Sequence, residues 1–254
     1  MATAYHPESY WSDVAKRIGE RSGTNVIAGD DEPYYRYKRE RFLEMLRTLD
    51  VEGKSVLELG PGPGGNLREL WAKKPARLVG ADISADMVAL ARKNNAPEVE
   101  LVKIDGTTLP FADQEFDVVF TATVLQHNTD DAMMRSILRE VCRVSKRKVV
   151  LFERVDDRIT GDDLCLARPI AYYAERCADN GFVLHQNEFI NIRVSYYLAG
   201  IVRKGLNPAS RQEGEPLNPL SLWIQQAAMP LTKRLDKVFT SAKDLAKLEF
   251  VRKG

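Results

Sequence analysis

A glycine-rich turn joins an apolar run to a helical pattern at residues 56–67, which read Val-Leu-Glu-Leu-Gly-Pro-Gly-Pro-Gly-Gly-Asn-Leu. Glycine lacks a Cβ and accepts positive φ, so such a turn lets a ligand approach the backbone closely at the start of a helix. Gly60, Gly62 and Gly65 satisfy G-x-G-x-x-G, and Asp82 follows about twenty residues later, as in dinucleotide-binding turns. The alternative is a tight strand-to-helix turn that holds no ligand.

Short apolar runs alternate with segments of helical period from residue 55 onward. This alternation is typical of a parallel sheet that is covered by helices on both faces. The runs that predict strands are residues 55–59, 77–82, 99–104, 116–121, 148–153, 182–190 and 245–252. Ligands of such sheets bind over the carboxyl ends of the strands, which is where the glycines and Asp82 fall.

Two segments lie outside the alternation. Residues 1–52 contain one amphipathic helical pattern and a cluster of tyrosines and cations, and we expect them to form a helical cap. Residues 191–243 carry two further helical stripes, so they predict a helical insertion before the last strand. A connection of that length usually has structure or a function of its own. The core is then residues 53–190 together with 244–254.

The composition excludes a protein that works by bulk charge. The chain has 254 residues, with 37 Lys and Arg against 36 Asp and Glu, for a net charge of +1. A protein that binds nucleic acid mainly by charge would carry a clear basic excess, so we expect no nucleic-acid partner. Three cysteines without metal-ligand spacing predict neither disulfides nor a metal site. No stretch is apolar enough to cross a bilayer, and we expect a cytoplasmic protein.

The strand ends together resemble the class I S-adenosylmethionine-dependent methyltransferase family. Its first motif has an acid two residues before a G-x-G-x-G, which here is Glu58 followed by Gly60, Gly62 and Gly64. The resemblance extends over residues 55–153. It implies a seven-stranded, mostly parallel sheet with helices on both faces and an antiparallel last strand. It also implies S-adenosylmethionine as cofactor and S-adenosylhomocysteine as product.

The resemblance assigns the cofactor contacts residue by residue. Asp82 matches the acid that receives both ribose hydroxyls, and Asp105 matches the acid that meets the adenine amine. The remaining positions that we expect to contact the cofactor are Ile83, Gly106, Thr121 and Gln126. An acid such as Glu58 would repel a pyrophosphate but favours the ammonium group of the cofactor. A nicotinamide enzyme would have no use for Glu58 or Asp105, so we consider an oxidoreductase unlikely.

Two residues are candidates for a general base. His127 follows the fourth strand, where the resemblance places the transferable methyl, and its ordinary pKa lies near neutrality. The alternative is a loop residue that packs or caps the next helix. Glu153 ends the fifth strand, with a solvated acid as its alternative role. The Asp/Asn-Pro-Pro-Tyr of amino-group methyltransferases is absent, because Thr121-Ala-Thr-Val stands there.

We therefore expect a metal-independent methyltransferase that acts on an oxygen of a small or carrier-linked acceptor, such as a glycan, lipid or secondary metabolite. Tyr34, Arg36 and Tyr37 in the cap are the predicted lid and acceptor contacts. The insertion is a possible acceptor wall or homodimer interface. The alternatives are transfer to nitrogen or carbon, and a catalytically silent cofactor-binding protein that acts as a sensor or scaffold.

Overall fold

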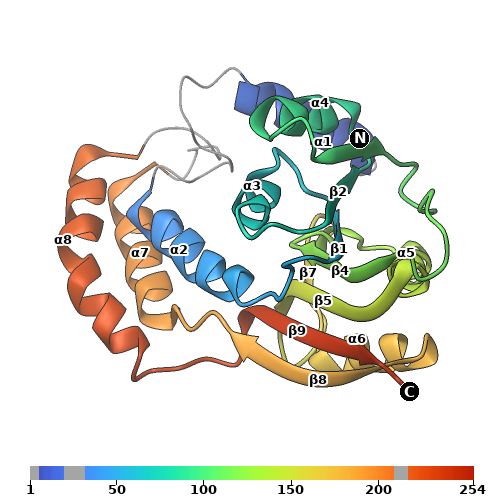
Figure 1. Ribbon diagram of the computed structural model, residues 1–254. Helices are drawn as coiled ribbons and strands as arrows, with labels where there is room; N and C mark the ends of the chain where they lie inside the picture. The colour runs from blue at the N-terminus through green and yellow to red at the C-terminus, as the bar shows by residue number, and fades with distance from the viewer. Residues whose placement is uncertain (1–5, 20–31, 209–216) are drawn as a thin grey trace.

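The structure is a computed structural model that describes residues 6–19, 32–208 and 217–254 (Figure 1). Parts of the predicted cap and of the predicted insertion, namely residues 1–5, 20–31 and 209–216, lie outside the described residues.

The main sheet has seven strands in the order β3-β2-β1-β4-β5-β9-β8. They are β1 (Ser55–Leu59), β2 (Arg77–Asp82), β3 (Glu100–Lys103), β4 (Phe116–Ala122), β5 (Ser145–Val155), β8 (Phe182–Phe189) and β9 (Asp244–Arg252). The first five run parallel, and β9 is antiparallel to both β5 and β8. The predicted fold class is confirmed, and every predicted strand is present with ends that shift by at most a few residues.

Helices cover both faces of this sheet because the central strands carry apolar residues on both sides. Leu57 and Leu59 of β1 pack in the core cluster that contains residues of α5 and α6, whereas Val56 packs in the cluster of α2 and α3. The helices are α1 (Pro7–Gly19), α2 (Pro33–Arg47), α3 (Gly65–Trp71), α4 (Ala85–Asn94), η1 (Leu125–His127), α5 (Asp131–Val144), α6 (Ile170–Asp179), α7 (Arg193–Leu206) and α8 (Pro219–Asp236).

A second, smaller sheet was not predicted from the sequence. Between β5 and α6 the chain forms a two-stranded antiparallel ribbon, β6 (Thr160–Gly161) and β7 (Leu166–Ala167). Strands of two residues are too short to show a period, so no apolar alternation predicts them. The ribbon matters for the site because its loop reaches the turn after β4.

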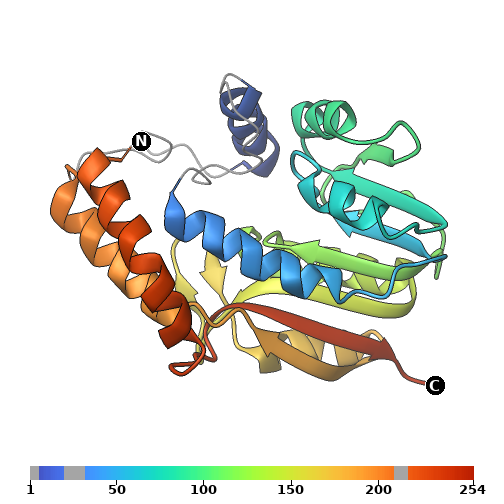
Figure 2. The same ribbon diagram turned by 60° about the vertical axis from the view of Figure 1, so that its left-hand side comes forward.

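The insertion folds as a hairpin of α7 and α8, and α2 runs from this hairpin across one face of the sheet (Figure 2). Tyr34 and Tyr37 of α2 are buried, with Tyr34 5.9 Å from the Tyr196 ring and Lys233 over the Tyr37 ring. Arg36 is exposed. The tyrosines therefore join the hairpin to the sheet, and their role toward an acceptor stays a prediction.

Candidate functional site

The carboxyl ends of β1 and β4 lie side by side where the strand order reverses, since β1 pairs with β2 on one side and β4 on the other. Chain connections leave such a point in opposite directions and open a crevice there, which is the usual ligand position of open parallel sheets. The glycine-rich turn follows β1, and Asp82 and Asp105 follow the neighbouring strands. The structure therefore brings these three predicted elements to one edge.

The glycine turn is tied to its neighbours by backbone contacts that leave its outer side open. The Gly60 amide donates to the Ala81 carbonyl at 2.8 Å. Gly62 has φ +51° and a Cβ placed there would meet no heavy atom within 4 Å, so the turn is open to a ligand at this point. At Gly64, φ is +85° and a Cβ would lie 2.1 Å from Asn95 Nδ2, so only glycine lets α4 approach.

Glu58 lies under this turn and is fully buried. Its Oε1 accepts a 2.7 Å hydrogen bond from Asn66 Nδ2, and Asn66 Oδ1 accepts one of 2.7 Å from Arg39 of α2. Its Oε2 is buried without a hydrogen-bond partner in the described part of the chain. Burial is the main cause that raises the pKa of Glu58 to about 8, and the Asn66 bond opposes it. A buried carboxylate oxygen without a donor is a position that a cationic ligand group can satisfy.

Asp82 ends β2 and fixes the turn next to Glu58. Its Oδ2 accepts from the Gly62 amide at 3.2 Å, and its Oδ1 accepts from the Ser84 amide at 2.9 Å. Ser84 in turn caps α4, accepting from the Met87 amide. Burial raises the pKa of Asp82 to about 6, while these backbone donors oppose the rise. Each oxygen keeps acceptor capacity for a hydroxyl donor, which fits the role of ribose acceptor that the sequence predicts.

Asp105 follows β3 and is exposed. Its carboxylate accepts from the amides and hydroxyls of Thr107 and Thr108 at 2.7–3.0 Å, and these bonds lower its pKa well below the usual range. Next to it, Gly106 has φ +88° and packs under Ile83, whose Cδ1 would lie 2.6 Å from a Cβ. The predicted pair Ile83 and Gly106 thus forms one apolar surface beside an ionised acid.

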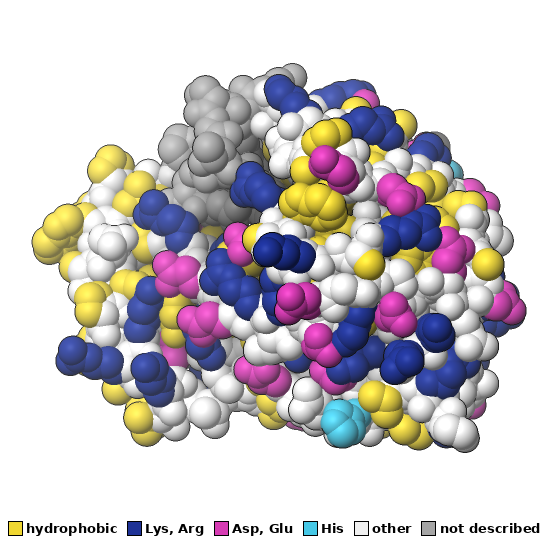
Figure 3. All heavy atoms as spheres, viewed as in Figure 1, with side chains coloured by type: hydrophobic (Ala, Val, Ile, Leu, Met, Phe, Trp, Pro, Cys, Tyr) yellow, Lys and Arg dark blue, Asp and Glu magenta, His cyan; other side chains and the backbone are white. Residues whose placement is uncertain are grey.

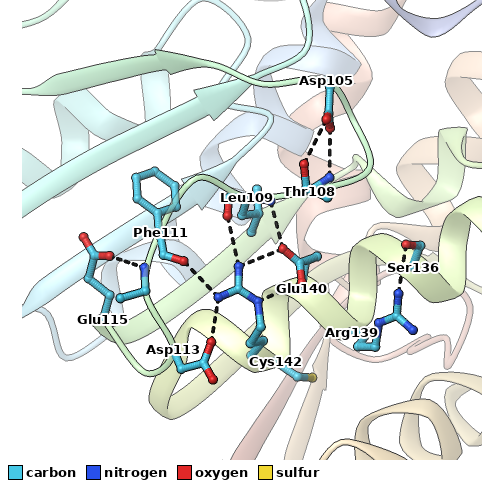
Figure 4. A network of polar contacts seen from close by, with 12 residues as sticks. Asp105, Thr108, Leu109, Phe111, Asp113, Glu115, Ser136, Arg139, Glu140 and Cys142 are labelled. Carbon is cyan, nitrogen blue, oxygen red and sulfur yellow. Dashed lines mark hydrogen bonds and ion pairs between the residues drawn. The ribbon is translucent and has the colours of Figure 1, made fainter.

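An arginine of α5 holds the loop that follows Asp105. Arg143 donates to the carbonyls of Leu109 at 3.0 Å and Phe111 at 2.9 Å, and Figure 4 shows the side chains and carbonyls of this loop gathered over α5. Glu140 accepts the Leu109 amide at 2.9 Å, and its ion pair with Arg143 lowers its pKa. The sequence analysis did not identify this network, which positions the loop rather than the ligand.

Glu153 is buried at the end of β5, so the alternative interpretation as a solvated acid is wrong. It accepts the Thr121 hydroxyl at 2.7 Å, the Val124 amide at 3.1 Å and the Gln126 amide at 3.1 Å. Burial raises its pKa, against the effect of these donors. The sequence predicts Glu153 as a base and Thr121 and Gln126 as cofactor contacts. In the structure these groups bind one another and shape the turn after β4.

His127 closes that turn as the last residue of η1. Its Nδ1 lies 2.8 Å from the Leu164 carbonyl of the β6–β7 loop. A carbonyl only accepts, so Nδ1 carries the proton and Nε2 keeps its lone pair, facing the Gln126 amide nitrogen at 3.2 Å. The Leu164 contact therefore selects the tautomer that a general base at Nε2 requires. Asp130, not His127, caps α5, through the Met133 amide at 2.7 Å.

Helix α1 reaches three of these strand ends. Trp11 packs edge-on against the His127 ring at 5.1 Å, Ser12 contacts the Ser84 hydroxyl at 3.0 Å, and Glu8 pairs with Lys103 at 3.0 Å. The sequence predicts the lid function most strongly for Tyr34, Arg36 and Tyr37. The structure instead brings α1 to the carboxyl edge, with Trp11 as its aromatic contact. In the sequence, Trp11 stands out only as an aromatic residue at helical spacing.

Within residues 6–19, 32–208 and 217–254, no three His, Cys, Asp or Glu side chains are grouped as metal ligands would be. In the same ranges, no helix has the length and apolar character needed to cross a bilayer.

The sheet order and its helices define a Rossmann-like α/β fold, with the candidate site at the point where the strand order reverses. Residues 56–148 match the family described as methyltransferase domain. The chain is similar to a demethylmenaquinone methyltransferase of Corynebacterium efficiens, at 36% identity over 54% of each chain. It is also similar to a fatty-acid O-methyltransferase of Mycolicibacterium smegmatis, at 37% identity over 33% of this chain and 31% of that one.

Among solved structures, the fold is similar to that of the magnesium protoporphyrin IX methyltransferase of Synechocystis with bound S-adenosylmethionine. The TM-score is 0.60 at 14% identity, covering 96% of this chain and 94% of the other. The chain spans about half or less of the length of the two curated relatives. The family match identifies residues 56–148 as a methyltransferase domain, and the fold agrees with that of class I S-adenosylmethionine-dependent methyltransferases, with no subfamily specified. The predicted family is confirmed.

Proposed function

We propose that this chain transfers a methyl group from S-adenosylmethionine to an oxygen of a small or carrier-linked acceptor. The observation that carries the proposal is the second carboxylate oxygen of Glu58, which is buried under the glycine turn without a donor among the described residues. A cationic ammonium group is the partner that such an oxygen favours. The residues present thus fit the amino-acid part of this cofactor.

The other residues of the edge fit the rest of the cofactor. Asp82 would accept the ribose hydroxyls, Asp105 the adenine amine, and Ile83 with Gly106 would offer an apolar surface to the adenine ring. When bound, S-adenosylmethionine supplies a methyl group that is already activated by its sulfonium, so the protein mainly aligns the acceptor.

His127 is the residue that we propose as general base. The Leu164 carbonyl keeps the proton on Nδ1, so Nε2 can take the proton of an acceptor hydroxyl. Glu153 acts through other groups: it holds the turn that carries His127 by accepting the Gln126 amide. Glu153 is thus a positioning residue. The names of the two relatives, one for a demethylmenaquinone and one for a fatty acid, support an apolar acceptor.

The experiment is an acceptor screen with methyl-labelled S-adenosylmethionine that measures S-adenosylhomocysteine by mass spectrometry. The panel contains fatty acids, quinols, phenols and carrier-linked acids. We expect label on oxygen of at least one acceptor. Cofactor binding by calorimetry without turnover on any acceptor would favour the alternative, a silent binding protein. Absence of binding would contradict both functions.

A further inference from the structure

The hairpin of α7 and α8 exposes most of the large apolar side chains on the described surface. Eight of the eleven exposed large hydrophobic residues lie in it, namely Tyr196, Tyr197, Ile201, Leu220, Trp223, Leu231, Val238 and Phe239. Single exposed apolar residues are ordinary, but a concentration in one segment marks an interaction surface. Trp223 is 68% exposed and Ile201 72%, so these are not partly covered core residues.

These side chains follow helical spacing on the outer sides of both helices. Tyr197 and Ile201 lie one turn apart on α7, and Leu220, Trp223 and Leu231 lie along α8. The inner sides are already filled, since Ala199 and Met229 are buried in the core. A groove of about 490 Å³ runs along the α7 side and is lined by its apolar side chains with Phe239 and Arg193. The outer surface is therefore separate from the hairpin's own packing.

The charges on the described part of the hairpin are almost all positive, whereas residues 209–216 between its helices add Arg211, Glu213 and Glu215. Its described residues, 191–208 and 217–243, contain seven Lys or Arg and a single acid, Asp236, which is buried. Three of the cations pair with acids elsewhere: Lys233 with Glu40, Arg203 with Glu32, and Lys243 with Asp156. The side chains of the other four have no hydrogen-bond or ion-pair partner among the described residues; they are Arg193, Lys204, Arg234 and Lys237. Figure 3 shows hydrophobic and cationic atoms together along the edge over α8.

From this surface we infer that the hairpin binds an anionic lipid membrane. Helices that lie in a membrane interface combine Trp, Phe and Leu with Lys and Arg, and bind by apolar burial together with attraction to anionic headgroups. The unpaired cations supply the attraction to anionic headgroups. A protein partner would have to match both helices and the groove with a shaped, fully packed surface, whereas lipid adapts to apolar side chains spread along the whole hairpin.

The position of the hairpin suits such a contact. It leaves the sheet after β8 and returns at Asp244, which pairs with Val155 at the carboxyl end of β5. The membrane-binding surface thus belongs to the same edge of the sheet as the candidate site. An acceptor held in a membrane would reach that edge without crossing the molecule. The inference itself does not depend on methyl transfer, because membrane binding is measured without cofactor or acceptor.

The test is sedimentation of the full chain with vesicles of phosphatidylcholine alone or mixed with phosphatidylglycerol, at low and high salt. We expect the chain to bind the mixed vesicles, and we expect high salt to weaken this binding. R234E/K237E should lower this binding by at least about 25-fold, since the loss of each cation near an anionic surface costs about fivefold and the introduced acids are repelled by that surface. The matched control K93E/K253E makes the same charge change at exposed lysines of α4 and the C-terminus, and should bind as the unaltered chain does. Trp223→Ser should weaken binding without changing its salt dependence.

Several outcomes would overturn the inference. One is equal binding by R234E/K237E and its control, and another is no binding to either vesicle. Binding to polyglutamate but not to vesicles would assign the surface to an acidic protein. A concentration-dependent dimer that Trp223→Ser dissociates, with no vesicle binding, would assign it to a second copy of the chain. Circular dichroism of each variant checks that loss of binding is not loss of folding.

Discussion

Asn66 donates its side-chain amide to one carboxylate oxygen of Glu58 and leaves the other oxygen buried without a donor in the described structure. One polar bond does not offset the removal of a carboxylate from water, so the protein keeps Glu58 protonated over a wide pH range. The pKa of about 8 is the net result of burial, which raises it, and of the Asn66 hydrogen bond, which lowers it. A cationic ligand group next to the second oxygen would reverse it.

Cofactor binding should therefore release a proton. An ammonium group favours the ionised form of Glu58, so its pKa falls below about 8 in the complex and S-adenosylhomocysteine affinity rises with pH up to that value. Calorimetry at pH about 7 in phosphate and in Tris measures the proton from the difference in heat. Glu58→Gln should abolish the difference. Equal heats for the unaltered chain would contradict this account of Glu58.

The same pKa shift predicts how the stability of the ligand-free chain varies with pH. Because the pKa of Glu58 is raised in the folded state, this group contributes to the stability of the fold. The contribution is fully present below the ordinary glutamate pKa of 4.5 and is lost as pH rises through about 8. Urea unfolding of the unaltered chain against Glu58→Gln should show the variant gaining relative stability across this range. Parallel pH curves for the two chains would be inconsistent with a buried, protonated Glu58.

Asp82→Asn should weaken S-adenosylhomocysteine binding by about 10- to 100-fold. The amide keeps the shape but loses the charged acceptor, and hydrogen bonds to charged groups contribute about 1.5–3 kcal/mol each. Asp86→Asn, which changes an exposed acid in the first turn of α4, is the matched control and should bind normally. Calorimetry measures both. If the two variants bind alike, Asp82 is not the ribose acceptor.

His127→Asn should lower kcat by about 100- to 10,000-fold on the acceptor found in the screen, the range for removal of a general base. S-adenosylhomocysteine affinity should stay within about twofold, because the proposed base acts on the acceptor. His185→Asn in β8 controls for loss of a histidine. A kcat for His127→Asn close to that of the unaltered chain would contradict the assignment of His127 as the general base.

Asp236→Ala should destabilise the chain by about 2–4 kcal/mol, because it removes a buried charge that caps another helix. Asp236 accepts the Val194 amide at 2.6 Å and the Ser195 hydroxyl at 2.5 Å, and α7 has no side-chain cap of its own. Lys237→Ala, the exposed neighbour, should cost little. Urea unfolding compares them. A cost for Asp236→Ala no larger than that of the control would show that the cap is dispensable.

The sequence predicts those features of the fold and of the candidate site that depend on local residue patterns. Apolar alternation places all seven strands of the sheet, and the spacing of Glu58, Asp82 and Asp105 places them at adjacent strand ends. The sequence pattern does not predict the β6–β7 ribbon, because a strand of two residues is too short to show a period. The burial of Tyr34 escapes for another reason: the hairpin that covers it lies more than 150 residues further along the chain. Contacts between distant segments decide both this and the Asp236 cap, and no spacing rule records them.

The base of the hairpin is closed by two hydrogen bonds. The Ile190 amide donates to the Leu245 carbonyl, and the Ser241 amide donates to Asn191 Oδ1, both at 3.0 Å. The chain thus leaves and re-enters the sheet at paired residues, and closing a longer or shorter segment there changes the entropy cost only slowly. The segment between them is replaceable without disturbing the pairing of β8 and β9, provided that its substitute covers Tyr34 and Tyr37. A chain with another segment at this position would keep the strand-end positions of Glu58, Asp82 and Asp105 unchanged.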